Sequence, residues 1–341
     1  MKLDLFYYKL PQKFIAQEPL LQRDRSKLMI LDKNTGQINN DIFFNIAKYV
    51  NSGDILVLNE SKVTKCRFLG FKEGTGAKIE CFVLKEIREK GKAKQYLALL
   101  KPSKKISVPT RVNIGNYFFT VKEKLGYGKA VVGFNESLAK ISDEVGKVPL
   151  PPYIKNENIE ESRYQTIYAR VKGSTAAPTA GFHFTEQLID KLKIVGVKFA
   201  KLRLNIGLDT FRPIVEEEIE EHKIHSEHYF LSELEAQKIN IARATGGKVI
   251  AVGTTTTRVL ETIMTKYGIL KGDEGDAELY VYPGYKFKII DRIITNFHLP
   301  YSTLLVMVSA FAGRENILKA YEAAKINNYR FFSFGDCMLI I

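Results

Sequence analysis

The chain has 341 residues, a formal net charge of +13 and 45% hydrophobic residues. These values exclude a disordered or collagen-like chain, and no apolar run reaches the roughly 20 residues that a membrane span needs. The first residues are not typical of a secretion signal, because Asp4 interrupts them and no apolar core follows. The cysteines form neither a disulfide framework nor a zinc pattern. We therefore expect a soluble protein of the reduced cytoplasm, with no membrane partner.

Most of the positive charge lies in one segment. Residues 61–150 carry 19 Lys and Arg against 8 Asp and Glu, a net charge of +11, whereas the rest of the chain is close to balance. A localised basic surface attracts a polyanion such as a nucleic acid. A solvated lysine-rich surface that only aids solubility would give the same composition.

The predicted elements begin with a strand at residues 54–59, which we expect to pair in the main sheet. The basic segment follows, and Gly, Pro, Lys and Ser separate its short apolar or alternating runs. Several short strands at this spacing favour a small barrel or sandwich. The expected strands are residues 66–71, 78–84, 95–100, 117–122 and 129–134. The proline-rich sequence at 148–153 favours extended backbone and marks a boundary.

After residue 180, strands and helices alternate. Strands are expected at residues 197–205, 248–253, 289–297 and 329–334, and helices at 232–245, 258–267, 302–312 and 315–326. Ser232 and Glu235 form a capping box at the start of one helix. This alternation argues for an α/β fold with some parallel pairing. We predict a multidomain α and β protein: an α/β core domain of residues 1–60 and 151–341, with a small β-barrel domain inserted at 61–150.

Two polar motifs follow predicted strands. Residues 248–258 (KVIAVGTTTTR) place four threonines before a helix, where N–H groups and hydroxyls could hold a carboxylate or simply cap the helix. Residues 295–303 (TNFHLPYST) place Asn296 and His298 at a strand end. Ligands of α/β sheets bind beyond the carboxyl ends of the strands, so both motifs would share one rim. A polar loop with a capping Ser302 is the alternative for the second motif.

A third motif is rich in small residues. Residues 173–184 (GSTAAPTAGFHF) permit close approach of the backbone to a ligand. His183 lies between two phenylalanines, where partial burial would shift its pKa. The alternative is a tight linker into a helix after Thr185.

Three histidines, His222, His225 and His228, recur every three residues and on a helix would share one face, as in a metal site. We expect no metal, because no H-E-x-x-H motif occurs and no cysteine is near. His225 and Glu227 could instead form an acid–base pair. The dinucleotide fingerprint G-x-G-x-x-G is also absent after the predicted strands, which disfavours an NAD enzyme.

Taken together and in order, these motifs resemble the S-adenosylmethionine:tRNA ribosyltransferase-isomerase family of the queuosine pathway. The match is carried by residues 10–19, 53–67, 148–154, 164–169, 176–184 (AAPTAGFHF), 209–213 (DTFRP), 221–227, 251–261, 283–287, 294–311 and 329–338. It covers nearly the whole chain and is weakest in the basic insert. Lys27 and Lys62 stand where the family usually has Arg, Phe182 replaces a usual Leu, and His228 replaces a frequent aromatic residue.

The resemblance implies an α/β core with an inserted β barrel and one reaction. The ribosyl portion of S-adenosylmethionine moves onto 7-aminomethyl-7-deazaguanine at the wobble position of tRNA with a GUN anticodon. Epoxyqueuosine forms, and adenine and methionine leave. S-adenosylmethionine would be a co-substrate, with no retained cofactor, and the protein a cytoplasmic monomer. The rival readings are a non-catalytic RNA-binding protein that uses the insert alone and a metal hydrolase built on the three histidines.

The resemblance also suggests roles for residues. The acid–base candidates are His183 and His298, with His225 or Glu227 as a third. The candidates for binding the small substrate are Tyr153, Thr179, Gly181, Asp209, Thr254, Thr255, Thr256, Thr257, Arg258, Asn296 and Asp336. Among these, the four consecutive threonines would hold the methionine carboxylate, and Tyr153 with Phe182 would form walls for the flipped base. The candidates for binding tRNA are Lys62, Arg67, Lys101, Lys104 and Lys105.

Overall fold

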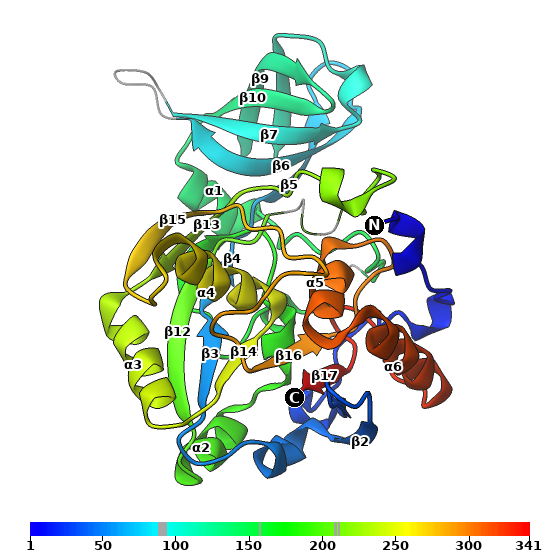
Figure 1. Ribbon diagram of the computed structural model, residues 1–341. Coiled ribbons are helices and arrows are strands. Elements are labelled where there is room, and N and C mark those ends of the chain that lie inside the picture. Colours follow the sequence, from blue (N-terminus) through cyan, green and yellow to red (C-terminus); the bar gives the residue numbers. More distant parts are fainter. Residues whose placement is uncertain (88–93, 157, 208–209, 211) are drawn as a thin grey trace. The chain divides into compact units, whose positions relative to one another are not determined.

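The computed structural model describes residues 1–87, 94–156, 158–207, 210 and 212–341 (Figure 1). The chain divides into two compact units. Unit 1 comprises Met1–Lys62 and Pro151–Ile341, and unit 2 comprises Val63–Leu150. Among the described residues, no helix is long and apolar enough to cross a membrane.

Unit 1 is built on a mixed sheet, in which nine strands are described. Its order is β15 (Asp273–Ala277), β13 (Glu227–Leu231), β12 (Lys198–Leu204), β3 (Ile55–Asn59), β14 (Val249–Val252), β16 (Arg292–Asn296), β17 (Cys337–Ile340), β1 (Lys27–Leu31) and β2 (Ile38–Ile42). The pairs β12–β3, β3–β14, β14–β16 and β1–β17 are parallel. The α/β class and the place of the 54–59 strand in this sheet are confirmed. A separate two-stranded sheet joins β4 (Ser61–Val63) and β11 (Val171–Ser174).

Helical segments cover both faces of this sheet (Figure 1). Along β3, Ile55 and Val57 join one apolar cluster, whereas Leu56 and Leu58 join the other, as the period-2 alternation of a strand requires. The first cluster includes α3 (Glu233–Ala244), α4 (Thr254–Tyr267), α5 (Thr303–Ala312) and α6 (Arg314–Ile326). The second includes α2 (Glu186–Ile194) and the 3-10 helix η4 (Phe43–Tyr49). Burial on both faces explains why the central strands are continuous apolar runs.

Hydroxyl side chains begin three of these helices. Thr185, Ser232 and Ser302 each accept a hydrogen bond from the backbone N–H three residues on, at 3.1–3.3 Å. Helix α4 differs, because it begins at Thr254, four residues before the predicted start at residue 258. Its N-cap is Gly253, whose φ of +93° suits glycine.

The predicted strand at 329–334 is wrong. In this stretch only Phe331 forms an isolated bridge, and Phe332 has a φ of +70°, which is incompatible with a strand. Its alternating aromatic residues instead pack into the core, where Phe331 lies 4.9 Å from Phe297 between ring centroids. The strand forms later, as β17, and was missed because its four apolar residues carry no alternation.

Unit 2 contains a closed barrel with the order β10-β7-β6-β5-β8-β9. The strands are β5 (Arg67–Lys72), β6 (Lys78–Ile87), β7 (Gln95–Lys101), β8 (Thr110–Ile114), β9 (Tyr117–Gly126) and β10 (Lys129–Phe134), followed by α1 (Leu138–Val145). A barrel agrees with the sequence prediction, which missed β8 and α1. The strands approach closely at Gly70, where a Cβ would lie 2.4 Å from the carbonyl oxygen of Asn113.

Candidate active site

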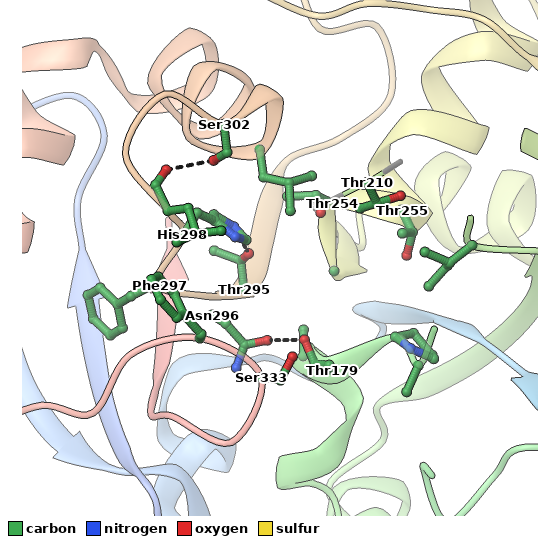
Figure 2. Close-up of a pocket in the computed structure, with 18 of the residues that line it drawn as sticks. Thr179, Thr210, Thr254, Thr255, Thr295, Asn296, Phe297, His298, Ser302 and Ser333 are labelled. Atoms are coloured by element: carbon green, nitrogen blue, oxygen red, sulfur yellow. Dashed lines mark hydrogen bonds between the residues drawn. The ribbon is translucent and has the colours of Figure 1, made fainter. Parts of the chain in front are cut away.

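A pocket open to solvent lies in unit 1 beyond the carboxyl ends of β14 and β16 (Figure 2). Its volume of about 650 Å³, including the mouth, suits a small-molecule substrate. Figure 2 shows Thr295, Asn296 and His298 on one side and Thr210, Thr254 and Thr255 on the other. The prediction that the threonine motif and the TNFHLPYST motif share one rim is therefore confirmed, and Thr179 of the small-residue motif joins them.

His298 lines this pocket and is held in place by the core. Its Nε2 lies 2.8 Å from Thr295 Oγ1, its backbone N–H donates to Tyr321 Oη at 3.0 Å, and its carbonyl accepts from Tyr8 Oη. Burial lowers its pKa to about 3, so the imidazole is neutral near pH 7. Within the described part of the chain, Nδ1 has no hydrogen-bond partner, which leaves that atom for a ligand.

His183 lies behind the pocket wall and does not line it. Thr179 Oγ1 donates to Asn296 Oδ1 at 2.8 Å, which directs the Asn296 amide N–H at His183 Nε2, 3.3 Å away. Nε2 is then an acceptor, so Nδ1 carries the proton and donates to Ser26 Oγ at 2.7 Å. Burial, with smaller contributions from Arg330 and Arg23, lowers the pKa of His183 to about 3. Its geometry is that of a residue that orients Asn296.

The four threonines at the start of α4 divide into two pairs. Thr256 Oγ1 donates to the Val252 carbonyl at 2.9 Å, and Thr257 Oγ1 donates to the Gly253 carbonyl at 3.2 Å, so both hydroxyls are occupied. Thr254 and Thr255 line the pocket, and the buried hydroxyl of Thr255 has no partner among the described residues. The first N–H groups of a helix lack intrahelical acceptors. The carboxylate site predicted from all four threonines therefore reduces to Thr254, Thr255 and the backbone of this turn.

Glu227 is the centre of a buried polar cluster beside the pocket. Its Oε1 accepts from Gly207 N–H at 2.8 Å and from Thr210 Oγ1 at 2.7 Å, and it lies 3.0 Å from His225 Nε2. Its Oε2 pairs with Arg258 Nη1 at 3.0 Å. Burial alone would raise the pKa of this carboxyl, but the hydrogen bond and charge of His225 and the charge of Arg258 outweigh it and hold the pKa below its usual value. An ionised, fully bonded carboxylate is suited to orienting His225 and unsuited to acting as a base.

Arg258 also bonds mainly to other groups of the protein. Its Nη2 donates to the backbone carbonyls of His225 and Ala277, which joins α4 to the loop before β13 and to β15. Arg258 does not line the main pocket. It lines a smaller cavity that shares Thr254 and Thr255 with it. The arrangement favours a structural role over direct contact with a ligand in the main pocket.

The remaining predicted residues divide between the pocket and the core. Tyr153 lines the pocket, and its Oη lies 2.7 Å from Ser333 Oγ. Gly181 does not line the pocket. A Cβ at this position would lie 1.9 Å from Tyr168 Oη, so close packing explains the glycine. Asp336 is also outside the pocket. It accepts the N–H groups of Lys27 and Arg330 at 3.0 and 2.7 Å. Asp209 lies outside the described residues.

The histidines spaced three apart do not share a helix face, because the chain there is extended and enters β13. His222 Nδ1 lies 2.8 Å from Glu216 and the exposed His228 lies 3.1 Å from Glu274, whereas His225 faces Glu227. No group of three or more His, Cys, Asp or Glu in the described ranges could hold a metal ion. The geometry therefore does not bring the three histidines together as ligands of one metal ion.

The tRNA-binding candidates have different surroundings. In unit 2, Arg67 forms an ion pair with Glu80 at 2.5 Å, so its charge is compensated. Lys101 and Lys104 are exposed, and Lys105 ends the short 3-10 helix Ser103–Lys105. Lys62 is half-buried in β4. The exposed lysines are the better candidates for phosphate contacts.

Sequence reasoning missed several residues that shape the site. Ser26 fixes the His183 ring, Thr210 holds Glu227, and Ser333 meets Tyr153. Thr210 and Ser333 lie within recognised motifs, at 209–213 and 329–338, whereas Ser26 lies outside them. For all three, the partner lies far away in the chain, so the sequence carried no signal for the contact. Thr295 also lies within a recognised motif, and the sequence did not show that its hydroxyl meets His298 Nε2.

The fold and the pocket together define an α/β protein that carries an inserted β barrel and a small-molecule pocket at the carboxyl ends of its central strands. Residues 3–340 match the family model described as queuosine biosynthesis protein, and the chain belongs to this family. The family resemblance inferred from the motifs is confirmed.

Relatives match over the full length. The chain is 49% identical over 345 residues to the S-adenosylmethionine:tRNA ribosyltransferase-isomerase of Caldanaerobacter subterraneus subsp. tengcongensis, and 50% identical over 344 residues to the protein of that name from Acetivibrio thermocellus. Both alignments cover all of each chain. A crystal structure of S-adenosylmethionine tRNA ribosyltransferase from Thermotoga maritima is 35% identical, with a TM-score of 0.57, and the match covers 99% of this chain and 100% of that one.

Proposed function

We propose that this chain is an enzyme that transfers and isomerises the ribosyl moiety of S-adenosylmethionine onto 7-aminomethyl-7-deazaguanine at the wobble position of tRNA. The product is epoxyqueuosine-tRNA, and adenine and methionine are released. The full-length relatives that bear the corresponding name support this function. The observation that carries it is the hydrogen bond of 2.8 Å between Thr179 and Asn296, which joins the two most specific motifs at one pocket.

The pocket offers a complementary group for each end of S-adenosylmethionine. Thr254, Thr255 and the N-terminus of α4 present hydrogen-bond donors where no acidic residue lies in the first turn, which suits the methionine carboxylate. The Asn296 amide, fixed by Thr179 and His183, suits the sugar hydroxyls. Tyr153, whose ring centroid lies 4.8 Å from that of Phe332, forms an aromatic wall for a purine.

His298 is the leading candidate for proton transfer. The sulfonium acidifies the neighbouring 5′ carbon, adenine must leave, and the aminomethyl group must lose a proton before it attacks. The neutral His298 imidazole lines the pocket with Nδ1 open, and a positioned acid or base contributes roughly 10²–10⁴ in rate. His225, oriented by Glu227 at 3.0 Å, is the second candidate. His183 and Glu227 act by positioning.

S-adenosylmethionine enters as a co-substrate and leaves as products, so the enzyme retains no cofactor. The RNA partner is tRNA with a GUN anticodon, and the net charge of +11 over residues 61–150 supports the barrel as the surface for its anticodon arm. The enzyme acts as a monomer in the cytoplasm.

Adenine release tests this function. The purified full chain is incubated with S-adenosylmethionine and either tRNA bearing the aminomethyl base or the same tRNA without it, and adenine is measured by chromatography. We expect release only with the modified tRNA. Absence of release from folded protein that binds this tRNA would contradict the proposal and favour a non-catalytic RNA-binding protein.

A further inference from the structure

A second, smaller hollow lies in unit 1 on the other side of His183. It has a volume of about 250 Å³, including its mouth, and its polar lining comprises Arg23, Ser26, His183, Arg330 and Ser333. Ser333 also lines the main pocket. The hollow and the main pocket are therefore linked by Ser333 and by the His183–Asn296 hydrogen bond.

In the described part of the chain, Arg23 has no carboxylate partner, and its guanidinium lies over the ring of Phe182, 5.5 Å from the centroid. The guanidinium donates to the backbone carbonyls of Gln165 at 2.6 Å and Ser162 at 3.2 Å, with a longer contact of 3.4 Å to that of Arg163. The neighbouring Arg163 likewise donates to backbone carbonyls, those of Leu20 and Leu21. Within the described ranges, no carboxylate forms an ion pair with either arginine. Half-buried like charges without a counter-charge are unfavourable, and burial and the charge of Arg163 both lower the pKa of Arg23.

Arg330 brings a second cation to the hollow. Its Nη2 lies 3.6 Å from Asp336 Oδ1, and its Nη1 makes only a long contact of 3.4 Å with the Glu18 carbonyl. Asp336 is already occupied by two backbone N–H groups. Arg330 thus keeps hydrogen-bonding capacity, and the residues that line the hollow include no carboxylate.

We propose that this hollow binds a phosphodiester group of the RNA substrate, held by the guanidinium groups of Arg23 and Arg330. This inference rests on the proposed function. Planar guanidinium forks match the oxygens of a phosphate, and the volume suits one such group. The amino-acid end of S-adenosylmethionine fits less well, because its ammonium needs an acceptor and the lining residues present cations instead. A phosphate anchored here lies next to the pocket in which the wobble base reacts.

The test compares Arg23→Gln with Arg25→Gln. Both arginines belong to the 3-10 helix Arg23–Arg25, but Arg25 is exposed and packs over Phe44, 5.1 Å from its ring centroid. The affinity of each full-length variant for tRNA is measured at several salt concentrations. For Arg23→Gln we expect about tenfold weaker binding or more, with the slope of log K against log salt lower by roughly 0.7–0.9. Arg25→Gln should keep the wild-type slope.

The affinity for S-adenosylmethionine distinguishes an RNA phosphodiester in the hollow from the carboxylate of S-adenosylmethionine. The affinity for S-adenosylmethionine should be unchanged in Arg23→Gln. If this variant bound S-adenosylmethionine more weakly and tRNA as tightly as the wild type, the proposal would be overturned in favour of a carboxylate site. Equal salt slopes for the two variants would also overturn it. Arg23→Lys retains the positive charge and loses the planar guanidinium. It should bind tRNA more weakly while the slope of log K against log salt stays that of the wild type. Absence of adenine release by the wild type would instead contradict the proposed function itself.

Discussion

His183 and His298 are both buried, and burial lowers the pKa of each to about 3. They differ in what surrounds the ring. His183 uses both nitrogens, on Ser26 and Asn296, whereas His298 uses Nε2 on Thr295 and turns into the pocket. Sequence placed the two histidines in equally specific motifs and offered no way to separate them. Only the positions of residues distant in the chain distinguish an orienting histidine from one that meets the substrate.

Replacement of His298 by Gln should lower turnover by roughly 10²–10⁴-fold, because a positioned proton-transfer group is lost. The affinity for S-adenosylmethionine should change little. Single-turnover adenine release and equilibrium binding measure the two quantities. The control is His228→Gln, since His228 is exposed on β13 and faces Glu274. Near-native turnover in His298→Gln would exclude it from proton transfer.

The same two histidines should make the stability depend on pH. Each is neutral in the folded protein down to about pH 3, whereas its usual pKa is 6.5. The unfolded chain therefore binds more protons between these values, and stability that is complete above pH 6.5 is lost as the pH falls. Near pH 5 each histidine contributes about 1.4 kcal/mol per pH unit to the slope of the unfolding free energy.

Urea unfolding of wild type, His183→Gln, His298→Gln and the double variant at several pH values measures these slopes. Each single replacement should reduce the slope near pH 5 by about 1.4 kcal/mol per pH unit, which corresponds to one proton, and the double replacement by twice that amount. An unchanged slope in either single variant would show that the histidine is protonated in the folded state.

At the scale of an element, the start of α4 sets the chemistry of the rim. Threonine is a weak helix former, so the sequence favoured a start after the four threonines. The helix begins earlier, at Thr254, because Gly253 adopts a positive φ as its N-cap. The hydroxyls of Thr256 and Thr257 also donate to the carbonyls of Val252 and Gly253, which stabilises this first turn. Thr254 and Thr255 consequently belong to a helix N-terminus, where donors are directed at the pocket.

Thr255→Val and Thr256→Val should have opposite consequences. Thr255→Val removes a hydroxyl at the pocket that bonds to no other described residue, so we expect about tenfold weaker binding of S-adenosylmethionine or more and unchanged stability. Thr256→Val removes the hydroxyl that donates to Val252 at 2.9 Å, so we expect about 1 kcal/mol lower stability and unchanged binding. Calorimetric titration and thermal unfolding of both variants suffice. Equal effects of the two on binding would contradict a carboxylate contact at Thr255.

Elements with strong local signals were predictable. The helix expected at 232–245 is α3, and Ser232 caps it as predicted, although Glu235 accepts from Lys201 N–H at 2.8 Å instead of returning to Ser232. The strand expected at 329–334 failed, because the burial that gives its aromatic pattern comes from packing around Phe297. Tertiary contacts override local periodicity in such short segments.

At the scale of the whole molecule, neutralising Lys101, Lys104 and Lys105 together by Gln should weaken tRNA binding at least tenfold. The slope of log K against log salt should fall by up to roughly 2–2.7, because each phosphate contributes about 0.7–0.9. Fluorescence anisotropy at several salt concentrations measures both. The matched control neutralises Lys238, Lys266 and Lys325, which form ion pairs in unit 1 at 2.6, 3.1 and 2.6 Å. Equal losses in both triple variants would indicate a general charge effect without a site in the barrel.

The whole-molecule organisation was also the part that sequence could describe best. Unit 2 spans Val63–Leu150. Its start is marked by the rise in positive charge and the short apolar runs from residue 61, and its end by the prolines near residue 150. Sequence could not tell which strands pair. Strand β17 enters the sheet between β16 and β1, a placement decided by contacts that local patterns do not report.

That placement has a consequence for how the chain folds. In the barrel, β5–β6, β6–β7, β8–β9 and β9–β10 are neighbours in sequence, so most of its pairing is local and fast to form. In the main sheet, β1 and β2 join the other strands through β17, and the Lys27–Asp336 hydrogen bond spans 309 positions. Closing such a loop carries a large entropic cost. Pulsed hydrogen exchange during refolding should therefore protect the amides of the barrel before those of β1.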